Sequence, residues 1–347
     1  MNPILRPLAA GFRLGVALRH AAYQRGWFKT RHLHRPVVSV GNLTVGGTGK
    51  TPLVAAIARI LRKRGLAPSI LTRGYGRRSR KPLVVLEPAA TRSPEPCECG
   101  DEPALLARAL PEVPMVICAD RYRAGCVAEE RFGVDVHLLD DGFQHLALAR
   151  DIDIVVLDTT QEISDRALLP VGRLREPSSA LKRADCVILT RLELGDPGPL
   201  EKQVRQINPL AAIFHTMTQF VQLVDIESGR IYPPHALEGE PVLAFCGIGN
   251  PKAFFADLRK WGFSVVAEQT FPDHYRYGDA DMEVIGMGFK KSGATALVTT
   301  EKDARNLFAS IPEEIPVVAC VIESSICEEQ AFEEWLLARL PAGGRAV

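Results

Sequence analysis

From residue 37 onward, apolar runs of strand length alternate with segments of helical periodicity, and this alternation constrains the fold of the 347-residue chain more than any other feature. The first series of such runs lies at 37–40, 68–71, 113–118, 134–139, 152–157 and 186–190. Continuous apolar runs separated by helices are typical of a mostly parallel sheet covered on both faces. We therefore predict an α/β domain in this part of the chain.

A glycine-rich loop follows the first apolar run and precedes a predicted helix, with the sequence Thr44-Val45-Gly46-Gly47-Thr48-Gly49-Lys50-Thr51. Such loops wrap phosphates with backbone N–H groups, place a lysine on the β/γ oxygens and offer a hydroxyl to Mg²⁺. The helix N-terminus adds its dipole. Thr44 replaces the usual leading glycine, and Val45 stands where the deviant version of the motif carries a second lysine. We predict that residues 44–51 bind a nucleotide.

A carboxylate at the end of a neighbouring strand usually helps such a loop to hold Mg²⁺. Asp140 and Asp141 end one apolar run and are followed by the string 142–145, whereas Asp158 ends the next run and is a rival. Adjacent acids point to opposite sides of a strand end, so one of the pair is expected to face the metal. The guanine-specific tetrad N-K-x-D is absent, which favours ATP over GTP.

Two polar loops contain candidate proton-transfer residues. Asp101 follows a proline-rich segment and precedes a predicted helix, where it either caps that helix or accepts the proton of an attacking hydroxyl. His274 lies in a proline-bent loop of the second half of the chain, where it is either structural or functional. Cys97 and Cys99 lack a second ligand pair, which argues against zinc.

Near residue 213 the pattern changes to a hairpin, and a second, smaller series of strands and helices follows. We predict a basic amphipathic helix at 1–28, a P-loop domain at 29–212, a hairpin linker at 213–240 and an α/β domain at 241–347. The helix either packs on the domain or lies on a membrane surface.

Charge is distributed unevenly along the chain. Residues 1–86 contain 17 Lys and Arg and no acidic residue, so the rest carries 25 basic against 41 acidic residues. This segregation predicts an anionic partner for the N-terminal part. No motif for nucleic-acid binding accompanies the basic segment, and no apolar run reaches the ~18 residues of a membrane-spanning helix. The cysteine content is not that of a disulfide scaffold and indicates a reducing cytoplasm.

Strings throughout the chain resemble one family, tetraacyldisaccharide 4'-kinase, the lipid A 4'-kinase of Gram-negative bacteria. They are Ser39-Val40-Gly41-Asn42-Leu43-Thr44 with Gly46-Gly47-Thr48-Gly49-Lys50-Thr51-Pro52, Thr72-Arg73-Gly74-Tyr75-Gly76, Gly100-Asp101-Glu102-Pro103, Asp140-Asp141-Gly142-Phe143-Gln144-His145, Gly172-Arg173-Leu174-Arg175-Glu176-Pro177, Phe271-Pro272-Asp273-His274-Tyr275 and Thr299-Thr300-Glu301-Lys302-Asp303-Ala304. The resemblance makes 29–212 a P-loop kinase domain.

The resemblance implies ATP- and Mg²⁺-dependent phosphorylation of the 4'-hydroxyl of a tetraacylated glucosamine disaccharide 1-phosphate, in lipopolysaccharide synthesis. It places the protein peripherally on the cytoplasmic face of the inner membrane. The resemblance also implies that Asp101 is the catalytic base and that His274 supports it. It implies that Lys50 and Thr51 bind phosphates and Mg²⁺ and that Asp140 and Asp141 lie at the metal. His145, Arg73 and Tyr75 are implied to be further residues of the site. The alternative is a P-loop ATPase or GTPase that acts as a metallochaperone or partitioning switch.

Overall fold

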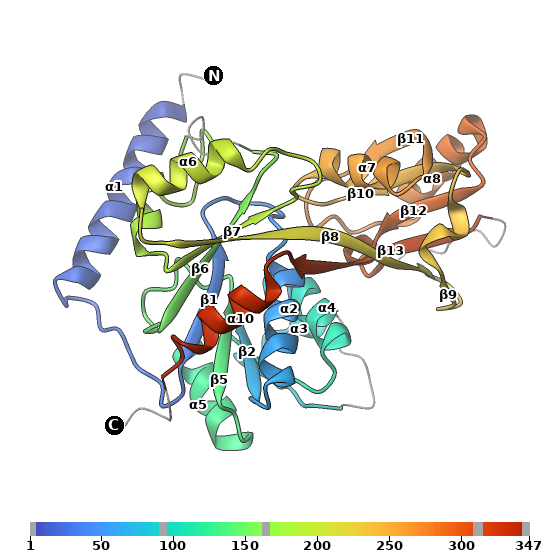
Figure 1. The fold of residues 1–347 in the computed structure, drawn as a ribbon. Helices are drawn as coiled ribbons and strands as arrows, with labels where there is room; N and C mark the ends of the chain where they lie inside the picture. The colour runs from blue at the N-terminus through green and yellow to red at the C-terminus, as the bar shows by residue number, and fades with distance from the viewer. Residues whose placement is uncertain (1–4, 90–95, 162–166, 308–314, 342–347) are drawn as a thin grey trace. The chain divides into compact units, whose positions relative to one another are not determined.

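The computed structural model describes residues 5–89, 96–161, 167–307 and 315–341 (Figure 1). The chain forms two compact units: unit 1 comprises Met1–Met217 with Ser324–Val347, and unit 2 comprises Thr218–Glu323. Two strands, β8 and β13, contribute residues to both units. Unit 2 is therefore inserted into the sequence of unit 1.

Unit 1 contains the predicted mostly parallel sheet, with the strand order β8-β7-β6-β1-β5-β2-β4-β3. The strands are β1 (Val37–Asn42), β2 (Pro68–Thr72), β3 (Leu83–Leu86), β4 (Met115–Cys118), β5 (Val136–Asp140), β6 (Ile152–Asp158), β7 (Cys186–Thr190) and β8 (Ala212–Asp225). The pairings from β8 to β4 are parallel, and β3 pairs with β4 in the antiparallel direction. The α/β fold expected from the sequence is confirmed.

Helices cover both faces of this sheet, because side chains along each buried strand alternate between two apolar cores. The helical segments of unit 1 are α1 (Leu5–Gln24), α2 (Lys50–Lys63), α3 (Pro96–Cys99), α4 (Asp101–Ala109), α5 (Arg121–Arg131), η1 (Ser178–Arg183), α6 (Gly198–Ile207) and α10 (Glu329–Leu337). Val38 packs in the core that includes α2, α4 and α10, whereas its neighbour Val37 packs in a core with α5. A third core joins η1 and α6 to β6 and β7.

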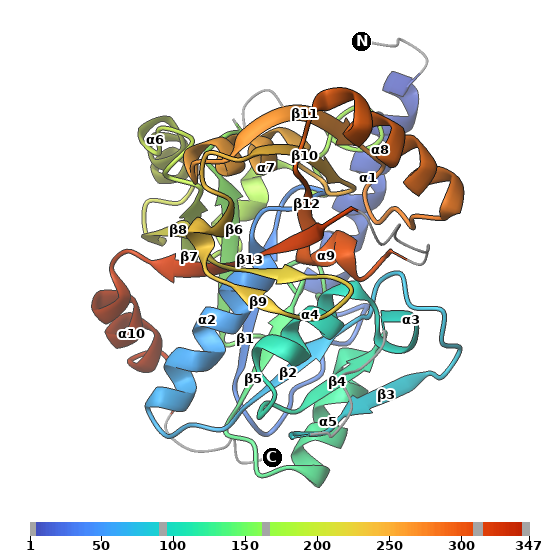
Figure 2. The ribbon, with the colours of Figure 1, turned by 90° about the vertical axis from the view of Figure 1, so that its right-hand side faces the viewer.

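Helix α10 belongs to unit 1, although the sequence analysis assigned it to the C-terminal α/β domain. Its Phe332 and Leu336 are fully buried in the same core as Leu53 of α2. Arg64 and Glu333 form an ion pair that joins the two helices, which lie beside each other in Figure 2. The apolar face of α10 completes the core of the first sheet, which the local sequence pattern does not reveal.

Unit 2 has a smaller parallel sheet with the strand order β11-β10-β12-β13. Its elements are β9 (Ile231–Tyr232), η2 (Pro234–Leu237), β10 (Pro241–Cys246), α7 (Pro251–Lys260), β11 (Ser264–Thr270), α8 (Asp279–Ser292), β12 (Ala296–Thr300), α9 (Glu301–Ala304) and β13 (Val317–Ile326). Helices α7 and α8 pack on opposite faces through Leu258 and Ile285. The predicted hairpin is present, since β9 pairs with the end of β8 in the antiparallel direction.

His215 of β8 joins two acidic side chains of unit 1. Its Nε2 lies 2.8 Å from Glu201 Oε1 on α6, and its Nδ1 lies 2.6 Å from Glu328 Oε1 just before α10. Burial alone would lower the pKa of His215, but the hydrogen bonds and charges of Glu328 and Glu201 raise it above its usual value. The protonated ring, with both nitrogens donating, is therefore favoured by folding.

This cluster predicts a pH-dependent contribution to the stability of unit 1. Because the folded-state pKa of His215 is raised, the contribution is complete below ~6.5, the pKa of an exposed histidine, and is lost as pH rises through the folded-state value. We expect His215→Gln to lower the melting temperature more at pH 5.5 than at pH 8.5, as measured by thermal unfolding. An equal loss at both pH values would contradict this charge-based account.

Candidate active site

The P-loop lies between the buried strand β1 and helix α2, as predicted. Gly49, the N-cap of α2, has a φ of 80° in the left-handed region, which favours glycine. The loop is held from inside by Asn42, whose Nδ2 donates to Thr48 Oγ1 at 3.0 Å, and by Thr190 of β7, whose hydroxyl donates to Thr48 O at 3.2 Å. Lys50 begins α2 and is 8% exposed. These contacts hold the loop in place before any phosphate binds.

Thr44 can replace the usual glycine because the backbone here forms a β-bridge. Thr44 pairs with Leu174 in the antiparallel direction, and Val45 N donates to Arg173 O at 2.9 Å. Arg175 N donates to Leu43 O at 2.7 Å on the other side of the bridge. The segment 173–175 therefore braces the start of the P-loop, and no left-handed residue is required at position 44.

Asp140, the last residue of β5, and Asp141, which follows it, lie beside the P-loop because β1 and β5 are adjacent parallel strands, with Val40 opposite Asp140. Asp141 Oδ1 lies 3.7 Å from Lys50 Nζ, and Arg175 Nη1 donates to both oxygens of Asp141 at 2.7 and 2.8 Å. Burial alone would raise the pKa of Asp141, but Lys50 and Arg175 lower it below its usual value. Asp141 is therefore a charged carboxylate shared by two cations.

Asp140 is buried and has a different environment. Its Oδ2 accepts a hydrogen bond from Thr72 Oγ1 at 3.0 Å, whereas its Oδ1 has no hydrogen-bond partner among the described residues. Burial, together with the charges of Glu102 and Asp141, raises the pKa of Asp140 to about 7. A buried carboxylate oxygen without a donor suits a hard cation or its bound water.

The residues present fit Mg²⁺ in the manner of P-loop proteins. No cluster of three His, Cys, Asp or Glu side chains that could hold a metal occurs in the described part of the chain. Mg²⁺ commonly takes only one or two protein ligands and completes its shell with phosphate and water oxygens. Thr51 at the start of α2 and Asp140 at the end of β5 supply a hydroxyl and a carboxylate of this kind.

Asp158, the rival acid, is engaged by its own loop. Its Oδ1 accepts from the Thr160 hydroxyl at 2.6 Å, and its Oδ2 accepts from Gln161 Nε2 at 3.1 Å. Arg191 Nε lies 3.6 Å from the same carboxylate. These contacts give Asp158 a structural role at the end of β6.

Two arginines at the site were not predicted from the sequence. Arg175 is the last residue of the segment 173–175 that braces the P-loop, and it binds Asp141. Arg121 begins α5 just after β4; it is 6% exposed, and its Nε has no hydrogen-bond partner among the described residues. Burial and the charge of Arg73 lower the pKa of Arg121, whereas Asp141 and Asp140 raise it. The position of Arg121 shortly after the end of a parallel strand is the sequence feature from which it could have been predicted as a site residue.

His145 follows the acidic pair and is half-buried. Burial first, and then the charges of Arg121 and Arg150, lower the pKa of His145 to about 4. The imidazole is therefore neutral near pH 7. In this environment His145 is suited to form neutral hydrogen bonds and is poorly suited to bind phosphate as a cation.

The loop that contains Arg73 and Tyr75 packs against the start of α4. Gly100 has a φ of 101°, and a Cβ atom there would lie 2.8 Å from Tyr75 O. Asp101 is the first residue of α4 and is 5% exposed, while Arg73 and Tyr75 are exposed. The N-cap of α4 is Gly100, so Asp101 does not occupy the N-cap position.

His274 lies in unit 2, in the loop between β11 and α8. Its backbone N donates to Gly247 O at 3.1 Å, and its φ of 61° is in the left-handed region. Asp101 belongs to unit 1 and His274 to unit 2, so their pairing stays a prediction.

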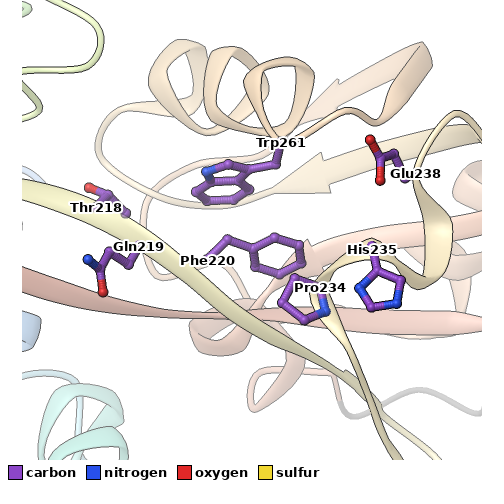
Figure 3. A pocket seen from close by; sticks show the side chains of 7 residues that line it. All are labelled: Thr218, Gln219, Phe220, Pro234, His235, Glu238 and Trp261. Carbon is purple, nitrogen blue, oxygen red and sulfur yellow. The ribbon is translucent and has the colours of Figure 1, made fainter.

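A pocket of about 490 Å³ lies elsewhere in unit 2 (Figure 3). Trp261 and Phe220 stack inside it, with their ring centroids 4.8 Å apart. The remaining lining residues are Thr218, Gln219, Pro234, His235 and Glu238. It contains none of the residues that the sequence predicted for the site.

The chain is similar to known proteins of one family. The family model described as tetraacyldisaccharide-1-P 4'-kinase (LpxK) matches residues 1–341. A tetraacyldisaccharide 4'-kinase of Geobacter metallireducens is 40% identical and covers 95% of this chain and 96% of its own, and one of Koribacter versatilis is 44% identical over 91% and 92%. The crystal structure of LpxK from Aquifex aeolicus in complex with ATP is 30% identical, with a TM-score of 0.75, and covers 97% of this chain and 98% of its own. The chain therefore belongs to the tetraacyldisaccharide-1-P 4'-kinase family.

Proposed function

We propose that this protein transfers the γ-phosphoryl group of ATP to the 4'-hydroxyl of a tetraacylated glucosamine disaccharide 1-phosphate. The observation that carries the proposal is the P-loop lysine facing the acidic pair, with Lys50 Nζ 3.7 Å from Asp141 Oδ1 and an unpartnered oxygen on Asp140 beside it. This is the arrangement that phosphoryl transfer requires, namely a phosphate cradle next to a carboxylate that can hold Mg²⁺. Membership of the kinase family across the chain supports the acceptor.

Each residue of unit 1 has a distinct part in this proposal. Backbone N–H groups of residues 46–51 bind the β- and γ-phosphates, and Lys50 offsets negative charge on the transferred group. Mg²⁺, held through Thr51 and Asp140, would neutralise charge on the β- and γ-phosphate oxygens. Asp141 orients Lys50 through their ion pair, and Arg175 neutralises the remaining charge of Asp141.

The proton of the acceptor hydroxyl goes to Asp101, supported by His274. Asp101 is buried as the first residue of α4, and the N-cap position itself is occupied by Gly100. His274 is held in a left-handed backbone conformation, a strain that functional loops commonly contain. Approach of the two groups over the bound sugar would assemble the base and exclude water.

We place the protein peripherally on an anionic membrane, the cytoplasmic face of the inner membrane, and the exposed apolar side chains of helix α1 support the binding to a membrane surface. Leu8, Leu14 and Leu18 are 59, 60 and 61% exposed, and Phe12 is exposed as well. The N-terminal part of α1 is therefore uncovered, whereas its last turns contact unit 1 through the buried Ala22 and the ion pair between His20 and Glu176. None of the helices in the described ranges is both long and apolar enough to cross a bilayer.

Replacing Leu8, Leu14 and Leu18 together by serine is expected to weaken binding to vesicles of phosphatidylglycerol and phosphatidylethanolamine by about tenfold or more, because each leucine contributes buried apolar area in the interface. Vesicle sedimentation measures the effect. Exposed sites rarely affect stability, so the melting temperature serves as the control. Equal binding by both proteins would contradict the membrane role of α1.

The acceptor is tested by measuring turnover of labelled ATP with and without the tetraacylated disaccharide 1-phosphate in detergent micelles. We expect label to appear in the glycolipid, and ATP consumption to depend on the acceptor. ATP hydrolysis at the same rate without acceptor, and no labelled lipid, would favour the P-loop ATPase alternative.

A further inference from the structure

Lys302 lies in the string 299–304, to which the proposed reaction assigns no role. Its ammonium group lies beside His274. Lys302 Nζ is 3.3 Å from His274 Nε2 and donates to Asp273 Oδ1 at 2.9 Å. Lys302 is 17% exposed. The ammonium group is therefore held between a carboxylate and an imidazole nitrogen, at the loop that contains the candidate catalytic histidine.

The hydrogen bond between Lys302 and His274 has one possible direction, and Asp273 Oδ1, which also lies 4.0 Å from His274 Nε2, is held by the same lysine. An ammonium group has three N–H donors and no lone pair, so Nε2 must be the acceptor. A neutral imidazole with a lone pair on Nε2 has its proton on Nδ1. The tautomer of His274 thus follows from the neighbouring lysine, through the hydrogen-bond network that must satisfy both groups.

The surrounding loop fixes both partners in place. Asp303, next to Lys302, is fully buried and accepts from Gly247 N at 2.8 Å, Tyr277 Oη at 2.9 Å and Thr300 Oγ1 at 2.6 Å. Gly247 O in turn accepts from His274 N at 3.1 Å. The buried carboxylate of Asp303 therefore holds Gly247, whose carbonyl binds His274, and also the start of the short helix α9, which contains Lys302.

We propose that Lys302 is a positioning residue that holds His274 as the neutral tautomer protonated on Nδ1. This inference rests on the proposed function, in which His274 supports the base. With this tautomer, Nδ1 carries the ring proton and is the donor of the imidazole, while the lone pair of Nε2 is occupied by Lys302. Lys302 itself touches no reacting atom in this scheme.

The tautomer is read by two-bond ¹H–¹⁵N correlation spectra of the full-length protein in detergent, labelled with ¹⁵N-histidine and assigned with His274→Gln. We expect the wild type and Lys302→Arg, which keeps donors, to show a protonated Nδ1 and an imine-type Nε2. Lys302→Met should show mixing with the other tautomer, whereas Lys291→Met, an exposed lysine of α8, should match the wild type. A wild-type spectrum with a protonated Nε2, or an unchanged ring in Lys302→Met, would overturn the proposal.

Kinetics supply the second readout. We expect Lys302→Met to lower kcat by about tenfold, a part of the usual contribution of a positioned proton-transfer group, with the KM for ATP little changed and with recovery in Lys302→Arg. A rise in the KM for ATP at constant kcat would contradict the positioning role. The failure of the proposed function is distinguishable, because His274→Gln with normal kcat would remove the catalytic role while leaving the spectral result intact.

Discussion

Replacing Lys50 by methionine is expected to lower kcat by roughly 10³-fold, since the loss of one preorganised charge at a transferred phosphoryl group has an effect of this order. Methionine keeps the buried aliphatic part of the side chain, and Asp141 retains its ion pair with Arg175. We therefore expect the melting temperature to change little. Labelled phosphate transfer and thermal unfolding, measured on the same preparation, test both statements.

Lys63→Met is the matched control for Lys50→Met. It makes the same substitution at the other end of α2, where Lys63 is 69% exposed and forms an ion pair with Glu329 at the surface. We expect normal turnover from this variant. Normal turnover from Lys50→Met as well would exclude the P-loop from the reaction.

Asp101→Asn is expected to lower kcat by roughly 10²–10⁴-fold with little change in the affinity for ATP, because the amide keeps the size of the side chain and loses its basicity. Some loss of stability is expected as well, because Asp101 is a buried acid in the first turn of α4, where a carboxylate interacts favourably with the helix dipole. Steady-state kinetics with the acceptor saturating, and nucleotide binding by calorimetry, separate these quantities. A variant with wild-type kcat and a lower melting temperature would show that Asp101 is structural.

His274→Ala tests whether the two units act together. If Asp101 and His274 form one functional pair, each single variant removes most of the benefit, and the double variant is little slower than either. Fully multiplicative losses would show that the two residues act independently.

The core of the site could be predicted because its parts follow from local rules. A glycine-rich loop between a strand and a helix binds phosphates in a defined way, and carboxyl ends of adjacent parallel strands meet at one edge of the sheet. This reasoning identified Lys50, Asp140 and Asp141 from the sequence. It did not distinguish the two acids, since only the positions of Arg175 and Thr72 show that Asp141 is ion-paired and that one oxygen of Asp140 has no partner.

Other features depend on contacts between distant residues. In the sequence, Arg121 is an ordinary arginine at the start of a helix, and only the folded sheet brings its charge near Asp140 and Asp141. Thr44 departs from the P-loop motif in the sequence, and only the structure shows that it pairs with Leu174. The membership of α10 in unit 1 depends on Phe332, which packs against Phe214 of β8 in the same core as α2. The apolar periodicity of α10 predicts that one face is buried but does not predict which elements cover that face.

The insertion of unit 2 has a consequence for the order of folding during synthesis. Arg64 of α2 and Glu333 of α10 are separated by 269 residues, so the ribosome must complete all of unit 2 before the last helix of unit 1 emerges. Contacts of such high sequence separation form slowly, and incomplete domains expose apolar surface meanwhile. During synthesis, one side of the core of unit 1 therefore stays exposed until α10 emerges. Chains truncated just before α10 are expected to need chaperones or to aggregate, even though they contain every residue proposed for catalysis.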